Sequence, residues 1–176
     1  MRHFSWKEAT ALAVTGAALF GLGCGGSSYH AAPEGVHPLG PASIRISPLT
    51  RLGTHQSGVP LLILHMEVRD AWGDTIKSLG RLRVMVTEPQ GVADTRTTLR
   101  QVSWEHDLES LDEQPRRWDR ATRTYRIQLR DVPEWLIHLA KAENRSSRPA
   151  TLTAVWTIRT QSAGEVTFKD EIEFVP

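Results

Sequence analysis

In the stretch LILHMEVR, residues 62–69, every second side chain is apolar, and those between them become polar from position 65 onward. The apolar set is Leu62, Leu64, Met66 and Val68, and the polar set is His65, Glu67 and Arg69. Successive side chains of a β-strand point to opposite faces. This period of two therefore predicts a strand with the apolar set in the core and the polar set on a face in water.

The same alternation returns along the chain, most clearly in RLRVMVT at residues 81–87 and TYRIQLR at residues 124–130. The other segments, of which 95–104 is the weakest, are residues 44–46, 95–104, 152–158 and 166–174. Seven strands separated by turn signals favour a single antiparallel β-sandwich, so the fold class is expected to be mainly β. The core is expected to include Leu64, Val84, Ile127 and Trp156.

One segment departs from this period. Asp131-Val132-Pro133-Glu134 combines a carboxylate that can cap a helix, an early proline and a glutamate three positions after the cap, which is typical of a helix start. Apolar residues then recur at helical spacing, and Asn144 can end the helix. We expect one short helix over residues 132–143 that connects two late strands and plugs one end of the sandwich.

The N-terminal segment has the pattern of an export signal. Arg2 and Lys7 give a positively charged start, and residues 10–23 carry no charge. This apolar run is too short to cross a bilayer, which takes about 20 residues. It matches the centre of a secretory signal peptide, which we place at residues 1–23.

Cys24, the only cysteine of the chain, follows this run directly and is flanked by small residues. Gly21-Leu22-Gly23-Cys24 resembles a bacterial lipobox, with Gly21 at the place where leucine is usual. The resemblance implies a lipid on the Cys24 thiol and a membrane as its partner. The alternative is an ordinary secretory signal cleaved nearby, with Cys24 discarded or left as a free thiol. A single cysteine excludes an internal disulfide.

Without residues 1–23 the chain has no net charge, because 21 basic and 20 acidic residues become 19 of each. Proteins that bind duplex nucleic acid usually carry a basic excess, so no nucleic-acid partner is expected. Residues 24–42 are rich in Gly, Pro, Ser and Ala and are predicted to hold the lipid attachment site and a flexible tether. Residues 43–176 are long enough for one β-sandwich domain.

The loop after residues 62–69 carries turn-forming residues in the run D-x-x-G-D-x-x-K-x-x-G, which begins at Asp70. Gly73 permits a positive φ angle. Asp70 and Asp74 can accept hydrogen bonds from nearby backbone N–H groups. These features predict a tight turn between two strands.

Together with Trp118-Asp119 and Thr124-Tyr125, this run resembles a group of uncharacterised secreted lipoproteins common in planctomycete bacteria. The resemblance covers residues 43–174. It implies a sandwich akin to transthyretin-like and carboxypeptidase-regulatory modules, and a place in the cell envelope. Its motifs are structural turns, so it implies no active-site residues.

No motif for catalysis or metal binding accompanies these turns. The histidines lack the close spacing of a zinc site and have no second cysteine to join them. The aspartates do not follow the spacing of an EF-hand loop, and aspartates in turns more often cap the backbone. The sequence contains neither a Gly-x-Ser-x-Gly elbow nor a phosphate-binding glycine loop. We therefore expect a protein that is not an enzyme and needs no cofactor or metal.

Two tryptophans and four arginines are the candidate ligand contacts: Trp72, Trp118, Arg81, Arg83, Arg126 and Arg130. The tryptophans fall in loops, where they either stack on sugar rings or fold back over the ends of the sandwich. Strand alternation places the arginines outward. There they either meet anionic envelope material or an acidic protein partner or are only solvated, because a GC-rich genome gives the same excess of arginine over lysine.

The expected function is that of a non-catalytic envelope lipoprotein, a binding or structural β-sandwich held at a membrane surface by Cys24. We expect it to be secreted across the inner membrane and anchored by lipid in the cell envelope, at the outer membrane or facing the periplasm. The alternative is a glycan-binding or glycan-processing accessory protein that uses exposed tryptophans.

Overall fold

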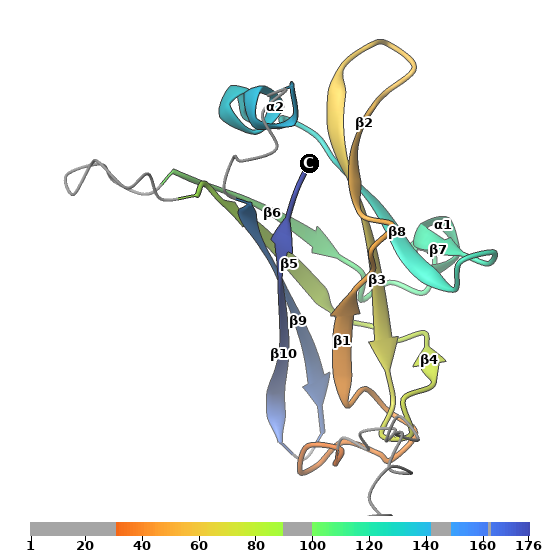
Figure 1. Ribbon diagram of the computed structural model, residues 1–176. Coiled ribbons are helices and arrows are strands. Elements are labelled where there is room, and N and C mark those ends of the chain that lie inside the picture. Colours follow the sequence, from red (N-terminus) through yellow and green to blue (C-terminus); the bar gives the residue numbers. More distant parts are fainter. Residues whose placement is uncertain (1–30, 90–99, 142–148, 162) are drawn as a thin grey trace, which may run out of the picture.

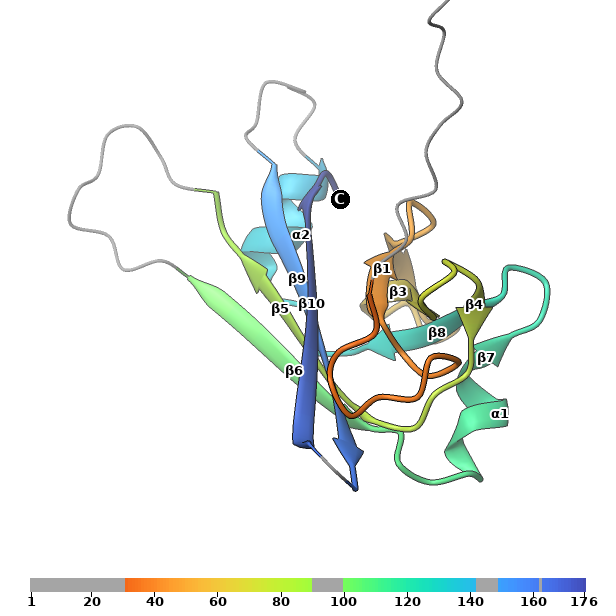
Figure 2. The same ribbon diagram turned by 90° about the horizontal axis from the view of Figure 1, so that it is seen from below.

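The computed structural model describes residues 31–89, 100–141, 149–161 and 163–176. Within these ranges the chain forms ten strands in two antiparallel sheets, together with two short helices. Figures 1 and 2 show the two sheets facing each other, with the helices at the margins. The predicted mainly β, sandwich-like architecture is confirmed.

The first sheet, called sheet A, is built around the strand that contains residues 62–69. Its strands are β1 (Ser43–Ile46), β2 (Arg51–Thr54), β3 (Pro60–Arg69), β4 (Thr75–Ile76), β7 (Trp118–Asp119) and β8 (Thr124–Leu129). The order across the sheet is β1-β3-β8-β7, and both β2 and β4 also pair with β3. The long, apolar β3 is therefore the centre of the sheet.

The second sheet, called sheet B, has four longer strands. They are β5 (Arg81–Thr87), β6 (Gln101–Asp107), β9 (Ala150–Thr160) and β10 (Gly164–Phe174). The order is β10-β9-β5-β6, so β10 and β6 are its two edges. The prediction of a strand over residues 95–104 is wrong at its C-terminal end, because β6 continues to Asp107. Residues 95–99 lie outside the described ranges.

The core lies between the two sheets, as the alternation predicts. Leu64, Val84, Ile127 and Trp156 are all fully buried. Leu64 lies opposite Ile127 in the β3–β8 register. The ring of Trp156 in sheet B lies 5.5 Å from that of Tyr125 in sheet A, measured between centroids. Burial of such large aromatic side chains makes a major contribution to the stability of a sandwich.

The two sheets are joined along one side. The backbone N–H of Ile46 in β1 donates to Oδ2 of Asp170 in β10 at 2.6 Å, and Figure 1 shows these two strands side by side. On the other side of the sandwich, β6 and β8 come close to each other, but no ladder joins them in the described residues. No ladder joins β1 and β10 in these residues either, but a pocket lies between β6 and the end of β8, and we call this side the open side of the sandwich.

The short helix predicted near residues 132–143 is present as α2 (Glu134–Lys141), and residues 142 and 143 lie outside the described ranges. Leu136 is fully buried in the core, and Trp135 and Leu139 pack against it, so the helix covers one end of the sandwich (Figure 1). Its start differs from the prediction. Asp131 has a φ of 58° and belongs to the turn after β8, so the helix begins only after Pro133.

Four elements of two to five residues were not predicted, because they are too short to show a clear period. They are β2, β4, β7 and the helix α1 (Glu113–Arg117). Of these, α1 matters most for the site below, because it follows β6 and precedes the strand that pairs with β8.

His65 is placed differently from the prediction. The alternation puts it on the wet face of β3, but it is only 5 % exposed. Its Nδ1 atom lies 2.9 Å from the hydroxyl of Thr124, and the Thr50 hydroxyl bonds to both its backbone N–H and its carbonyl. Burial, followed by the charge of Arg126, lowers the pKa of His65. This histidine is thus a buried, hydrogen-bonded part of the sheet.

The turn predicted after β3 has the expected form. Gly73 has a φ of 86°, a conformation that glycine adopts without steric cost. Oδ1 of Asp70 accepts the backbone N–H groups of Trp72 at 3.0 Å and Asp74 at 2.9 Å. The aspartate therefore fixes the turn, as its position in the sequence suggested.

Gly80 is a second glycine that the fold requires, and for a different reason. A Cβ atom at this position would lie 2.7 Å from Cε2 of Trp156 and 2.8 Å from the carbonyl oxygen of Thr157. Only a residue without a side chain allows the indole of Trp156 to lie against the chain just before β5. This contact seats the largest buried side chain of the core.

We expect Gly80→Ala to lower the free energy of unfolding by about 1–3 kcal/mol, because the added methyl overpacks a site closed by an indole ring and backbone. Chemical denaturation measures the loss. Leu79→Ala is the matched control: Leu79 is 43 % exposed, so its loss should stay within about 0.5 kcal/mol. Equal stability of the two variants would contradict the close packing of Trp156 on Gly80.

Candidate functional site

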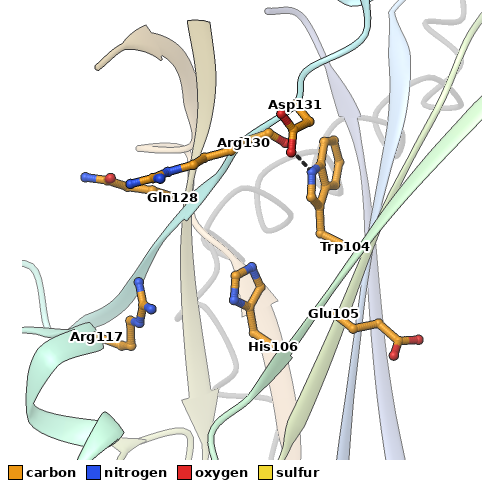
Figure 3. A pocket seen from close by; sticks show the side chains of 7 residues that line it. All are labelled: Trp104, Glu105, His106, Arg117, Gln128, Arg130 and Asp131. Carbon is orange, nitrogen blue, oxygen red and sulfur yellow. Dashed lines mark hydrogen bonds between the residues drawn. The ribbon is translucent and has the colours of Figure 1, made fainter. Parts of the chain in front are cut away.

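A pocket of about 310 Å³ lies at the open side of the sandwich, between β6 and the end of β8. Its lining comes from β6, from α1 and from the segment around the end of β8 (Figure 3). The lining residues are Trp104, Glu105, His106, Arg117, Gln128, Arg130 and Asp131. Elements far apart in the sequence thus supply one concave site.

The position of Trp104 follows from the strand period. Trp104 and His106 lie opposite Val84 and Leu82 in the β5–β6 register, so they share the inward face of β6. Because β6 is the edge of sheet B, their side chains reach past the core to the neighbouring sheet. Nε1 of Trp104 donates to the backbone carbonyl of Arg130, which links β6 to the end of β8 across the pocket.

Two arginines line the pocket on the side away from Trp104. In Figure 3, the side chains of Gln128 and Arg130 lie next to each other, Arg117 lies apart from them beside α1, and His106 lies between Arg117 and Trp104. Arg117 has a long ion pair with Glu113, 3.6 Å between Nε and Oε2. Arg130 forms no side-chain ion pair or hydrogen bond within the described residues. This side therefore offers positive charge that the part of the chain described by the structure leaves largely uncompensated.

The two carboxylates of the lining lie elsewhere. The side chain of Glu105 points away from the pocket in Figure 3 and pairs with Arg83 on the outer face of sheet B at 2.6 Å. Asp131 lies at the Trp104 end. The pocket is thus polarised, with guanidinium groups at one end and a carboxylate at the other.

His106 lies half-buried between these ends. Burial lowers its pKa below the ordinary 6.5, and the nearby positive charge of Arg117 lowers it further. The imidazole is consequently neutral at neutral pH and has one donor and one acceptor nitrogen to offer.

A buried hydrogen-bond network holds α1, and with it Arg117, in place. The side-chain amide of Gln114 donates to the carbonyl oxygens of Ser78 at 2.9 Å and Leu108 at 2.8 Å. Its Oε1 atom is bonded to the hydroxyl of Tyr125, a fully buried residue of β8. Because the network pins Gln114, the guanidinium three residues later is directed to the pocket.

The two tryptophans proposed from the sequence lie apart from this pocket. Trp72 is 51 % exposed in the turn after β3. Trp118 in β7 is half-buried; its ring meets that of Tyr125 edge-on at 5.2 Å, and Nζ of Lys77 lies 5.4 Å above it. Trp118 therefore folds back over the core, which is one of the two alternatives expected from the sequence. Trp72 instead is exposed to solvent.

The four arginines proposed from the sequence are all exposed, but they do not form one surface. Arg81 and Arg83 lie on β5 in sheet B, whereas Arg126 lies on β8 in sheet A, so they face opposite sides of the sandwich. Arg81 pairs with Glu165 and Arg83 with Glu105. Arg130 alone reaches the pocket. Cys24 lies outside the described residues.

The sequence analysis missed Trp104, His106, Arg117 and Gln128. The strand period could have indicated the first two, because Val102, Trp104 and His106 share one face of β6. The predicted strand ended at residue 104 and therefore did not include His106. No local signal marks Arg117, which belongs to a five-residue helix.

The chain matches no protein-family model, and no curated protein or solved structure shows significant similarity to it. No described helix is long and apolar enough to cross a membrane. In the same residues, no three metal-ligating side chains converge on one point. The site must therefore be interpreted from its own geometry.

We expect the stability of the protein to fall between about pH 8 and pH 5, and His106 to contribute to this loss. The unfolded chain binds a proton on this histidine near pH 6.5, whereas the folded chain, with its lowered pKa, binds it only at lower pH. The stabilisation is therefore complete above about pH 6.5 and is lost as the pH falls toward the folded-state pKa.

The variant His106→Gln should lose less free energy of unfolding than the wild type over the same range, as measured by urea denaturation. Some loss should remain, because the pKa of His65 is lowered as well. At about pH 8 histidine is neutral in both the folded and the unfolded state. The difference in free energy of unfolding between the two proteins at this pH therefore measures the effect of the substitution on packing alone. If the free energies of unfolding of the two proteins change in parallel with pH, His106 does not contribute to the loss of stability.

Proposed function

We propose that this protein is a non-catalytic binding module whose open-side pocket recognises an anionic group, and that a lipid on Cys24 holds it at a membrane of the cell envelope. The observation that supports it is the presence of two guanidinium groups, those of Arg117 and Arg130, on the side of the pocket away from Trp104. A binding role was expected from the sequence, and the pocket is the concave surface that we propose for it.

The chemistry of the lining favours a carboxylate or phosphate group. Guanidinium groups present planar pairs of N–H donors that match two oxygens at once. The Gln128 amide and the neutral His106 add donors that carry no charge. The indole of Trp104 offers an apolar wall for the body of the ligand.

The same lining supports binding in preference to catalysis. A hydrolase needs a nucleophile or an activated water beside a base. The seven lining residues include no serine, threonine, cysteine or lysine. Burial and then the charge of Arg117 lower the pKa of the only histidine among them, His106, and the lining offers no hydroxyl or thiol that its neutral ring could activate.

The proposed location rests on the N-terminal sequence. Residues 10–23 are uncharged, Cys24 follows them directly, and a stretch rich in Gly, Pro and Ala leads to β1. This order is that of a signal peptide, an anchor and a tether, as in the secreted planctomycete lipoproteins that the chain resembles. A module on such a tether samples the surface of its membrane for a partner.

A second candidate is glycan binding, and exposed aromatic surface favours it. Trp72 is half exposed in a rigid turn, and Trp104 lines the pocket. Aromatic faces of this kind stack on sugar rings. An acidic glycan would satisfy both the indole and the guanidinium groups of the pocket, so glycans with and without a carboxylate separate the two candidates.

The anion site predicts that phosphate or succinate shifts the NMR signal of the Trp104 indole N–H. The double variant Arg117→Gln/Arg130→Gln should weaken this binding by about tenfold or more, because hydrogen bonds to charged groups contribute about 1.5–3 kcal/mol. Arg126→Gln, an exposed arginine outside the lining, is the matched control and should leave the affinity unchanged. A response to neither anion, or an equal loss in the control, would contradict the proposed site.

The anchor predicts that Cys24→Ser moves the protein from the membrane fraction to the soluble fraction after export. One acyl chain gives only marginal membrane binding, so firm retention requires the several chains of a bacterial lipoprotein. Ser27→Ala, three residues further along, is the control and should remain in the membrane fraction. A wild-type protein that is already soluble after export would rule out the lipid anchor and leave the pocket unaffected.

A further inference from the structure

The geometry points to a peptide as the ligand. We propose that β6 accepts an extended segment of a partner protein as a fifth strand of sheet B, and that an acidic side chain of this segment enters the pocket to meet Arg117 and Arg130. This inference rests on the proposed anion site and names the class of ligand that carries the anion.

The pairing of β5 with β6 shows which backbone groups of β6 are free. Gly80 and Leu108 exchange both of their N–H···O bonds, at 3.4 and 2.9 Å, and Glu88 N–H donates to Arg100 at 2.9 Å. In an antiparallel ladder such bonded pairs recur at every second residue. The N–H and C=O groups of Gln101, Ser103, Glu105 and Asp107 therefore point away from β5, and they have no backbone partner within the described residues.

This edge is long and regular enough to act as a template. All seven residues of β6 pair with β5 in one continuous register without a bulge. Proteins usually protect such an edge with inward-pointing charges, bulges or covering segments, because an open edge recruits further strands. β6 lacks these devices among its described residues: its inward side chains are Val102, Trp104 and His106.

The other edge of the same sheet provides the comparison. β10 carries an inward-pointing carboxylate, Asp170, and this group bonds to the N–H of Ile46 in β1. Its outer face carries four charged side chains, those of Glu165, Lys169, Glu171 and Glu173. One edge of sheet B thus carries an inward-pointing charge bonded to a neighbouring strand, whereas the described residues of β6 carry charge only on their outer face.

The free edge and the anion site adjoin each other. Side chains of an added strand would alternate, so every second one would face inward beside Trp104 and His106. On that side the guanidinium groups of Arg117 and Arg130 lie across from β6 (Figure 3). One strand can therefore satisfy both the unpaired backbone of β6 and the uncompensated positive charge.

Charge favours a partner peptide over a second copy of this chain. The inward residues of β6 include no carboxylate, so an edge-to-edge dimer would leave Arg130 without a counter-charge. A foreign strand with an inward aspartate or glutamate supplies it. Such strand addition is an established mode of peptide recognition, in which the backbone gives affinity and side-chain pockets give specificity.

The test uses the mature full-length chain and a fluorescent nine-residue peptide of alternating threonine and valine with one central glutamate and a lysine added at each end. Fluorescence polarisation should show saturable binding, and hydrogen exchange should show new protection at the amides of Ser103 and Glu105. The peptide with central glutamine should bind about tenfold more weakly. A peptide that binds without protecting these amides would overturn the inference.

Ser103→Pro is the decisive variant. Proline removes an N–H that faces away from the sheet and breaks no bond to β5, a position that an edge strand tolerates. We expect it to weaken peptide binding at least tenfold, while the control Ser103→Ala binds as the wild type does. A peptide N-methylated at its central amide repeats the test without altering the protein, should the proline variant fail to fold. Equal binding of the methylated and unmethylated peptides would overturn strand addition.

The same experiments separate this inference from the proposed function. If phosphate and succinate bind in a manner that depends on Arg117 and Arg130 but no peptide binds, strand addition is wrong and the anion site stands. If the peptides with glutamate and with glutamine bind equally, the acidic side chain has no role and the inference is wrong in that form. If Ser103→Pro instead converts a dimer to a monomer in sedimentation, the occupant of the edge is a second copy and the peptide is excluded.

Discussion

The hydroxyl group of Tyr125 is the polar constraint on which the arrangement of this sandwich depends. Its ring is fully buried between the sheets, against Trp156 of sheet B and Trp118 of β7. A buried hydroxyl without partners is costly, and here it accepts the N–H of Ser78 at 2.8 Å and bonds to Oε1 of Gln114. Burial raises the pKa of Tyr125, so the group remains a proton donor. Sheet A, the segment before β5 and α1 are thereby held at one point.

This constraint extends to the candidate site through a few bonds. Gln114 can satisfy Tyr125 only if α1 lies against β8 at the margin of the sandwich, and the same turn of helix then places Arg117 at the open side. Trp104 crosses from β6 to the backbone of Arg130 and closes the inner wall of the pocket. On the opposite side, the carboxylate of Asp170 accepts the N–H of Ile46 and joins β10 to β1. The asymmetry of the sandwich is thus what gives it a binding side.

The sequence indicated only part of this site, for physical reasons that differ between residues. Arg130 was among the candidates because strand alternation requires it to point outward, and it reaches the pocket only because β8 ends there. Arg81 and Arg83 met the same criterion, but their carboxylate partners come from other strands and occupy them. Arg117 could not be found, since a five-residue helix has no period and its direction depends on the Gln114 network. Exposure of the two loop tryptophans likewise depends on whether a ring such as that of Tyr125 lies within reach.

Taken alone, the sequence determined the fold class, the strands of sheets A and B that are long enough to show a period, the turn fixed by Asp70 and Gly73, and the buried set that includes Leu64, Val84, Ile127 and Trp156. These features depend on local chemistry, namely the alternation of a strand and the conformational freedom of glycine, which any single strand carries in its own residues. Only the tertiary structure decided which strands are edges, which side of the sandwich stays open, and that His65 is buried while Trp72 is not. Those properties depend on which segments meet across long sequence separations, and no residue carries that information by itself.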